Sequence, residues 1–374
     1  MSSSRALLAQ ILAAPREAGT PGAAAAREAL STHLAILGFT VEEQPFAFSP
    51  ATLLAFPVLG AGLGWLALLQ IPLLLIGHVP RWGALVAWLF GLGALAVLVA
   101  GMGLGWAVPG AATRQDANLI ATRGTDIRCW IVAHSDSKAQ GHSMAGRLVA
   151  VWIVALSVLV TTLLAMGRLA LGAPLPAWGV SVGAALAVTA GTLAGRGRLR
   201  GGSRGALDNG SGMLAALVAA ETSGEAPVGL LITGAEEFGL VGARVFAATR
   251  GALLHGSDVI NVDTVDDRGT LYFVRHDHAS ETLSTELSRR LAHLAVPMVS
   301  RRLPAGIFVD SLALRRGAAR TVTIGRLDWS TLRRIHTPRD LPEDHEFATA
   351  ESVGIALGEM VSGGKRETGS GKGK

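Results

Sequence analysis

Short polar motifs that could perform chemistry lie at the ends of apolar runs in this sequence. The motif Gly-Ala-Leu-Asp-Asn-Gly-Ser-Gly at 205–212 places Asp208 in a glycine-framed turn before an apolar helix expected at 213–220. Taken alone, this motif is also typical of an Asx turn or a helix N-cap. The other motifs contain His134 with Asp136, the pair Glu236 and Glu237, Asp263, and His336. Because open α/β sheets collect their ligands at strand ends, we expect these side chains to meet.

The residue types at these positions fit a centre that holds two divalent metal ions. Two such ions, about 3.5 to 4 Å apart and bridged by one carboxylate, can activate a water molecule and polarise a peptide carbonyl. Zinc accepts imidazole nitrogen and carboxylate oxygen, so we expect Asp208 to bridge two zinc ions. In this prediction His134 and His336 complete one site, and Glu237 and Asp263 complete the other. A position stays open for the bridging water.

Two acidic residues beside the expected ligands are predicted to be catalytic. Adjacent residues at the end of a strand point in different directions, so Glu237 can bind metal while Glu236 faces the water as the general base. Asp136 lies two residues after His134, and its carboxylate can hold the other imidazole nitrogen and fix the tautomer.

Each motif also has a common structural explanation. A His-x-Asp after a strand is usually a loop pair, a Glu-Glu pair is usually a solvated helix start, and Asn-Val-Asp is usually a strand end. Their occurrence together in one chain favours the metal centre. His276 and His278 flank Asp277 and could imitate a metal site. No further ligand is near them in the motif order, so we expect no site there.

The segments that must position these motifs alternate between strand and helix patterns. Strands are expected at 40–48, 117–121, 128–133, 228–234, 257–263 and 320–325, and Pro45 indicates that the first is an edge strand. Helices are expected at 21–37, 239–249, 280–294 and 347–361. This order predicts an α/β domain. The composition of 363–374 predicts a disordered tail.

Four charge-free apolar segments interrupt this pattern, in a chain that is 50% hydrophobic. They lie at 53–77, 83–108, 148–166 and 175–194, and each is long enough to cross a hydrocarbon core of about 30 Å. Short turns join them in pairs, so we expect two transmembrane hairpins. Tryptophans near the span ends would be interfacial anchors: Trp82, Trp106, Trp152 and Trp178. The alternative, buried core helices, fits these lengths poorly.

Basic residues are concentrated on one side of the predicted spans. The loops within the hairpins hold Arg81 and Arg168, whereas the other side holds Arg114, Arg123, Arg128, Lys138, Arg147, Arg196, Arg198, Arg200 and Arg204. The bias of basic residues towards the cytoplasm therefore predicts a four-span membrane protein with a cytoplasmic catalytic domain. No nucleic-acid motif accompanies the net charge of +5, so no nucleic-acid partner is expected. The single cysteine, Cys129, excludes a disulfide framework and a cysteine zinc site.

The order of the motifs resembles that of a known enzyme family. Five segments are similar to those of the di-zinc metallopeptidase family of aminopeptidase Y, aminopeptidase S and glutamate carboxypeptidase. They are His134-Ser-Asp136-Ser, Asp208-Asn-Gly-Ser-Gly, Glu236-Glu237, Asn-Val-Asp263 and Ile-His336-Thr-Pro-x-Asp340. The lead-in from Arg16 to Gly22 is similar as well. The resemblance implies a three-layer fold with a mixed central sheet, two zinc ions per chain, Glu236 as the base, and removal of residues from the N-terminus of peptides.

The resemblance covers nearly all of the sequence outside the apolar segments. We expect a peptidase domain at 1–50, 110–146 and 196–362, transmembrane hairpins at 51–109 and 147–195, and a tail at 363–374. The predicted function is that of a membrane-integrated di-zinc aminopeptidase, with peptides as substrate and the lipid bilayer as partner. The alternatives are a catalytically inactive membrane scaffold with the peptidase fold and a glutaminyl cyclase-like enzyme.

Two departures from the family pattern affect the expected site. Some members place a tyrosine before the last histidine, where it helps to polarise the substrate carbonyl, but this chain has Ile335 there. The polarising group is therefore unassigned. Asp310-Ser311 stands where relatives often show Asp-His, so Asp310 is a candidate contact for the substrate amine or for a neighbouring site residue.

Overall fold

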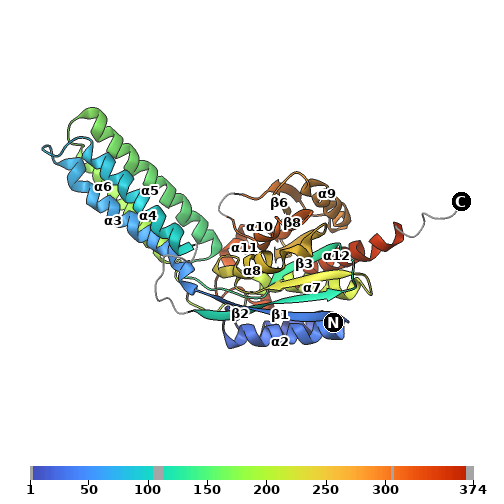
Figure 1. The fold of residues 1–374 in the computed structure, drawn as a ribbon. Coiled ribbons are helices and arrows are strands. Elements are labelled where there is room, and N and C mark those ends of the chain that lie inside the picture. Colours follow the sequence, from blue (N-terminus) through green and yellow to red (C-terminus); the bar gives the residue numbers. More distant parts are fainter. Residues whose placement is uncertain (1–2, 104–112, 305–306, 368–374) are drawn as a thin grey trace. The chain divides into compact units, whose positions relative to one another are not determined.

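The computed structural model describes residues 3–103, 113–304 and 307–367, which form two compact units (Figure 1). The first unit comprises Met1–Phe48, Thr113–Ala139 and Gly201–Lys374, and the second Ser49–Ala112 and Gln140–Arg200. Both expected hairpins fall within the second unit. Trp106, the end of the span expected at 83–108, and residues 368–374 of the expected tail lie outside the described residues.

The first unit is built on a mixed sheet of eight strands in the order β1-β2-β4-β3-β5-β8-β6-β7. Its strands are β1 Thr40–Phe48, β2 Arg114–Arg123, β3 Cys129–His134, β4 Val228–Thr233, β5 Asp258–Val265, β6 Thr270–Arg275, β7 Met298–Arg302 and β8 Arg320–Leu327. The four central strands β4, β3, β5 and β8 run parallel. Pro45 lies on the edge strand β1, as predicted, whereas β6 and β7 were not expected.

Alternating side chains of the central strands form a core on each face of the sheet. On β3, Ile131 packs into one apolar cluster, while Trp130 and Val132 pack into the other. Helices α1 Ser3–Ile11, α2 Pro21–Ile36, α7 Gly212–Thr222, α9 Ser280–Arg290 and α12 Ala348–Glu367 cover the first face. The opposite face is covered by α8 Val241–Arg250 and α10 Asp310–Leu314. The predicted three-layer α/β arrangement is therefore confirmed.

Two helices of this unit differ from the sequence expectation. Helix α1 was not expected, although its Leu7, Leu8 and Ile11 are buried against the core. Helix α12 runs to Glu367, so the described part of the segment expected as a disordered tail from Gly363 is helical. At the end of this helix, glycine and charged residues replace the apolar stripe by which a helix is recognised in a sequence. The sequence pattern therefore does not show that the helical backbone hydrogen bonds continue there.

The second unit is a bundle of four helices that lie side by side (Figure 1). They are α3 Ala55–Leu75, α4 Gly83–Gly103, α5 Met144–Leu171 and α6 Ala177–Gly195. All four are long and apolar enough to cross a membrane. Helices α3 and α6 approach closely through small residues, since a Cβ on Gly60 would lie 2.2 Å from the Cβ of Ala194. Large apolar side chains such as Phe90 and Trp152 face outward.

Candidate metal centre

The carboxyl ends of three neighbouring parallel strands bring the first candidate residues together. Strand β3 ends at His134, and Asp263 lies near the end of β5 beside it. On the other side of β3, β4 leads into the short 3-10 helix Glu236–Phe238. Because parallel strands end at one edge of the sheet, residues far apart in the sequence meet there.

Asp208 enters this edge from a tight turn before α7. Gly205 opens the turn with a φ of +56°, and a Cβ there would lie 2.5 Å from the carbonyl oxygen of Asp208. Only glycine therefore fits both the backbone conformation and the space. The peptide bond between Asp208 and Asn209 is cis. The Asn209 Nδ2 donates to the Val262 carbonyl at 2.9 Å, which ties the turn to β5.

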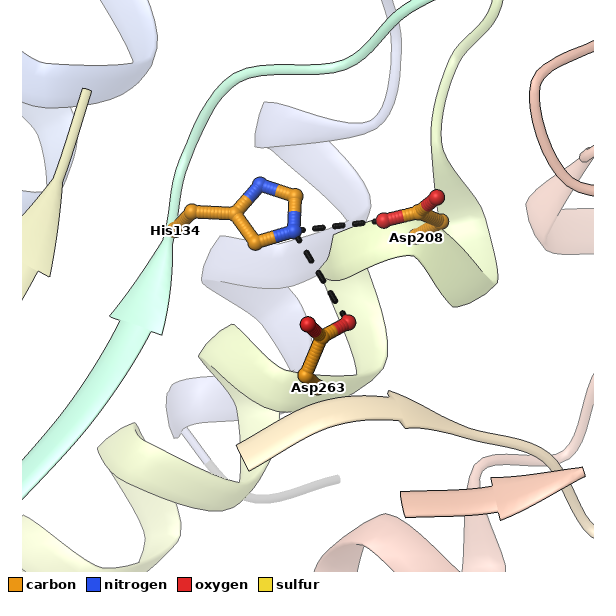
Figure 2. A group of neighbouring side chains, drawn as sticks. All are labelled: His134, Asp208 and Asp263. Carbon is orange, nitrogen blue, oxygen red and sulfur yellow. Dashed lines mark ion pairs between the residues drawn. The ribbon is translucent and has the colours of Figure 1, made fainter. Parts of the chain in front are cut away.

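The two carboxylate oxygens of Asp208 face two different histidines. Its Oδ1 lies 3.2 Å from the Nε2 of His134, and its Oδ2 lies 3.1 Å from the Nε2 of His336. Asp263 Oδ1 lies 3.9 Å from the same nitrogen of His134 (Figure 2). Glu237 Oε1 lies 3.4 Å from the Nε2 of His336. Asp208 is thus shared by two groups of three possible ligands, whose candidate atoms lie within 4.8 Å of one another.

The five candidate ligands come together, but their expected pairing was wrong. His134 groups with Asp263, and His336 groups with Glu237, instead of the two histidines sharing one group. The reason is spatial: β3 and β5 are neighbours, so their terminal side chains lie on one side of Asp208, while His336 reaches the opposite oxygen from a loop beyond β8. The order of motifs along the chain does not contain this information.

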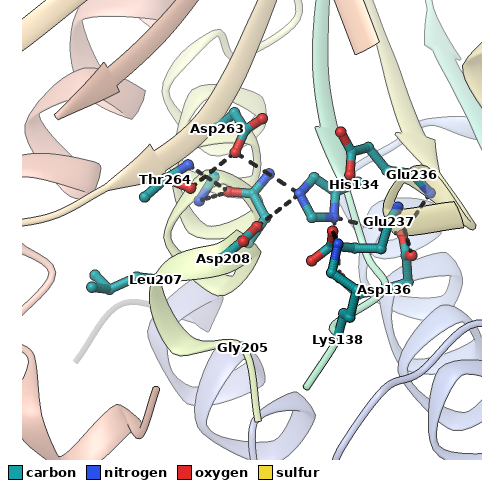
Figure 3. A network of polar contacts seen from close by, with 12 residues as sticks. His134, Asp136, Lys138, Gly205, Leu207, Asp208, Glu236, Glu237, Asp263 and Thr264 are labelled. Atoms are coloured by element: carbon teal, nitrogen blue, oxygen red, sulfur yellow. Dashed lines mark hydrogen bonds and ion pairs between the residues drawn. The ribbon is translucent and has the colours of Figure 1, made fainter. Parts of the chain in front are cut away.

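Asp136 has a different role from the one expected. The imidazole Nδ1 of His134 lies 3.1 Å from the backbone carbonyl oxygen of Asp136 and 3.6 Å from its carboxylate, so the hydrogen bond is to the carbonyl. The carboxylate instead accepts from the backbone N–H groups of Glu236 at 3.0 Å and Glu237 at 3.2 Å (Figure 3). Asp136 therefore fixes the turn that carries the predicted base.

Lys138 also belongs to the site. It was not predicted from the sequence as a site residue and was counted there only as one of the basic residues that flank the predicted spans. Its side chain is buried, and its Nζ lies 2.5 Å from the Oε2 of Glu237 (Figure 3). A lysine four residues after a histidine carries no recognisable site signal. The burial of the chain after β3 is what makes it part of the centre.

Arg16 and Asp340 hold the ligand-bearing segments together. The fully buried Arg16 donates from Nε to the Ser135 carbonyl at 2.9 Å and from Nη2 to the Gly205 carbonyl at 3.1 Å. Asp340 accepts from the backbone N–H groups of Leu207 at 2.8 Å and Asp208 at 3.1 Å. Both residues stand in motifs that the family resemblance had singled out, but their contacts join loops and cannot be derived from spacing.

Charge in the site is dominated by buried carboxylates. Burial alone would raise the pKa of Asp208, but the imidazoles of His134 and His336 hold it well below its usual range. Burial opposes protonation of His134, yet Glu236 and the nearby aspartates raise its pKa well above the usual value. Burial, together with Glu237 and other carboxylates, raises the pKa of Glu236 well above its usual range. Such a cluster favours an added positive charge.

The donor set fits a pair of zinc ions. Imidazole nitrogen and carboxylate oxygen are ligands that zinc accepts, and each group supplies three of them. The buried Oε1 of Glu237 makes no hydrogen bond among the described residues and has only the Nε2 of His336 at 3.4 Å, while its other oxygen is paired with Lys138. A carboxylate oxygen buried without a hydrogen bond is costly, and a cation bound by Glu237 and His336 would satisfy it.

The remaining candidates divide into one near the centre and two away from it. Asp310 is buried, accepts from the hydroxyl of Thr233, and has its Oδ1 without a partner among the described residues. Burial raises the pKa of Asp310 to about 7. His276 contacts the hydroxyl of Ser311 at 2.8 Å, and the Nδ1 of His278 lies 3.6 Å from the Oε2 of Glu281. Neither histidine belongs to the two ligand groups.

Known proteins resemble this chain in sequence over part of its length and in fold over nearly all of it. Residues 183–360 match Peptidase family M28. An aminopeptidase from Aneurinibacillus sp. strain AM-1 is similar with a TM-score of 0.54 and 15% identity, over 95% of this chain and 92% of that one. A Zn-dependent exopeptidase from Parabacteroides distasonis has a TM-score of 0.57 and 14% identity, over 96% and 97%. Porphyromonas gingivalis glutaminyl cyclase has a TM-score of 0.57 and 13% identity, over 97% of both chains. The comparison with curated proteins gives no match.

Proposed function

Because this chain carries a domain of peptidase family M28, we propose that it is a membrane-integrated di-zinc aminopeptidase. The observation that carries the proposal is the sharing of Asp208 between two three-residue ligand groups, with Glu236 directly before a member of one group. The peptidase class follows from the family. The zinc count, the specificity for N-terminal residues and the membrane location are our proposals.

Each residue of the centre has a defined part in the proposed reaction. His134, Asp208 and Asp263 would hold one zinc ion, and Asp208, Glu237 and His336 the other. When bound, the ions polarise the substrate carbonyl and make a water molecule more acidic. The carboxylate of Glu236 accepts a proton from the attacking water and then donates it to the nitrogen of the leaving amine.

The residues around the ligands keep this arrangement in place. Asp136 holds the backbone N–H groups of Glu236 and Glu237, so the base and its neighbouring ligand move together. The backbone carbonyl of Asp136 faces the Nδ1 of His134, which leaves Nε2 of that ring for the metal. Asp310, buried with its Oδ1 unpaired within the part of the chain that the structure describes, is the proposed contact for the amine of the substrate.

The membrane location is supported by the composition of the helical bundle. All four helices have the length and hydropathy of membrane spans, and Trp152 and Trp178, near the starts of α5 and α6, are exposed on their surface. Exposed tryptophans on a charge-free surface are costly in water and favourable at a membrane interface. The two hairpin loops hold few basic residues, whereas the other side of the spans holds many. Because basic residues favour the cytoplasmic side, the peptidase domain is proposed to lie in the cytoplasm.

Glutaminyl cyclisation is the second candidate function, because a glutaminyl cyclase is among the structures with the same fold. We propose hydrolysis instead because both ligand groups are complete, so that the chain has ligands for two zinc ions. A catalytically inactive scaffold of this fold would be expected to lose a ligand, and none of the five expected ligands is replaced.

Zinc quantification together with a screen of aminoacyl reporter peptides tests the proposal. Wild type and Glu236→Gln are expected to contain two zinc ions per chain, but only wild type should release N-terminal residues. Asp208→Asn should lose zinc as well as activity. Glu286→Gln, at a half-buried position of α9 outside the two ligand groups, is the matched control and should behave like wild type.

Two results would count against the proposal. Purified protein that binds no zinc from a metal-buffered solution would support the inactive scaffold. One zinc ion per chain, with ammonia released from peptides that begin with glutamine, would support the cyclase.

A further inference from the structure

One end of the four-helix unit carries basic side chains that have no acidic partner. Residues 49–112 and 140–200 contain no aspartate or glutamate at all. The end at which α5 begins and α6 ends holds a group of arginines that we name the arginine collar: Arg147, Arg196, Arg198 and Arg200. None of the four therefore has an acidic partner within this unit. Their charges are uncompensated there.

Contacts inside the unit hold the collar together. The backbone N–H of Gly141 donates to the Arg198 carbonyl at 3.3 Å, and the Gln140 Nε2 donates to the Gly197 carbonyl at 2.5 Å. The segment after α6 is thus paired with the segment before α5. Arg147 lies one turn into α5, with its guanidinium 5.9 Å from the ring centroid of Phe56 at the start of α3. The four arginines therefore share one end of the bundle.

The collar borders the apolar outer surface of the bundle. Arg196 directly follows the last residue of α6, and on α5 Arg147 is followed by the exposed Val151 and Trp152. Helix α5 has 28 residues, so it is about 42 Å long and exceeds a hydrocarbon core of about 30 Å. With Trp152 at the membrane interface, the first turns of α5 extend into the layer of lipid headgroups.

The opposite end of the bundle lacks such a group. Its two arginines are Arg81, which is exposed, and Arg168, which is buried. Arg168 donates to the carbonyls of Ile76 at 3.3 Å and Val79 at 3.1 Å and so serves the turn between α3 and α4. Charge that has no acidic partner within the unit is therefore concentrated at the collar, where Arg196, Arg198 and Arg200 are exposed.

We propose that the arginine collar binds the phosphate groups of anionic phospholipids in the leaflet that surrounds it. Guanidinium groups match phosphate oxygens with two parallel donors, and each basic residue beside an anionic leaflet strengthens the attraction by a factor of about five. The arginines then have two consequences: they orient the bundle, and they select the lipids around it. This inference rests on the proposed membrane insertion and is independent of the proposed peptidase activity.

Lipid retention by the full-length chain tests the inference. The protein is purified in mixed micelles with equal amounts of phosphatidylglycerol and phosphatidylcholine, and the retained lipids are quantified by mass spectrometry. Wild type should retain a several-fold excess of phosphatidylglycerol, and this excess should disappear in Arg196→Gln/Arg198→Gln/Arg200→Gln. Arg81→Gln, at the opposite end, is the control and should keep the excess. Equal retention of both lipids by wild type, or an unchanged excess in the triple variant, overturns the proposal.

Two further arms separate the sources of the effect. If inorganic phosphate at the same concentration displaces the phosphatidylglycerol completely, the collar is a site for free phosphate and the lipid assignment is wrong. The triple variant should melt at the wild-type temperature in phosphatidylcholine alone, which shows that it is folded. A chain washed off vesicles by alkaline carbonate contradicts membrane insertion, whereas an inserted chain without lipid preference contradicts only the collar.

Discussion

At the scale of single residues, the site contains a buried cationic side chain, Lys138, in addition to the candidate metal ligands. Its ammonium is buried 2.5 Å from Glu237 Oε2, and removal of one partner of a buried ion pair costs about 3 to 5 kcal/mol. We expect Lys138→Met to lower the melting temperature strongly in a chelator. Zinc supplies positive charge to the carboxylate that is left, so the loss should be smaller in zinc-saturated protein.

Thermal unfolding with and without zinc measures this difference. Arg290→Met removes the exposed pair with Glu286 and is the matched control, with an expected effect below about 1 kcal/mol in both conditions. An equal loss for Lys138→Met with and without zinc would show that the lysine has only a packing role.

Arg16 acts on the ligands through the backbone. Its guanidinium joins the carbonyls of Ser135 and Gly205, which lie in the segments of His134 and Asp208. Loss of an outer contact of a metal site typically costs about 10 to 100-fold in affinity. We expect Arg16→Met to weaken zinc binding by this factor in a chelator competition, whereas Arg289→Met, on an exposed part of α9, should leave it unchanged. Wild-type zinc affinity in Arg16→Met would exclude a positioning role.

At the scale of elements, the turn before α7 depends on glycine at one position. Gly205 and Gly224 both have positive φ, but a Cβ on Gly205 would collide with the backbone of the Asp208 turn, whereas no atom lies within 4 Å of one on Gly224. Gly224→Ala should therefore cost only the conformational strain of about 1 to 2 kcal/mol. Gly205→Ala should cost more and also weaken zinc binding, as measured by unfolding and by zinc titration. Equal losses of stability and of zinc affinity in the two variants would mean that the Asp208 turn accommodates the added Cβ at position 205.

At the scale of the whole molecule, the basic end of the bundle predicts its orientation. Because arginines near span ends are retained in the cytoplasm, a fluorescent protein fused after Lys374 should fluoresce in a bacterial host. An export-dependent alkaline phosphatase fused in the loop at 172–176 should be active, and the same enzyme fused at the tail should be inactive. The reverse pattern would place the peptidase domain outside the cytoplasm.

Much of the fold and the membership of the candidate centre could be derived from the residues themselves. Strands such as β1 and β3 are readable because β-branched and apolar residues favour a pleated, half-buried or fully buried backbone. The helices of the bundle can be predicted from the sequence because long apolar segments without charged residues are typical of membrane spans. The five candidate ligands could be predicted because each stands at the end of an apolar run or in a turn, and open α/β sheets collect their ligands at strand ends.

The tertiary structure alone decided how these residues are paired and supported. His134 shares an oxygen of Asp208 with Asp263 because β3 and β5 are neighbours, and no spacing along the chain encodes that adjacency. Lys138 became a site residue, and Asp136 a support for Glu236, because loops that are remote in sequence pack over the same sheet edge. Local patterns report the environment that a residue needs, whereas contact partners are set by the packing of the whole chain.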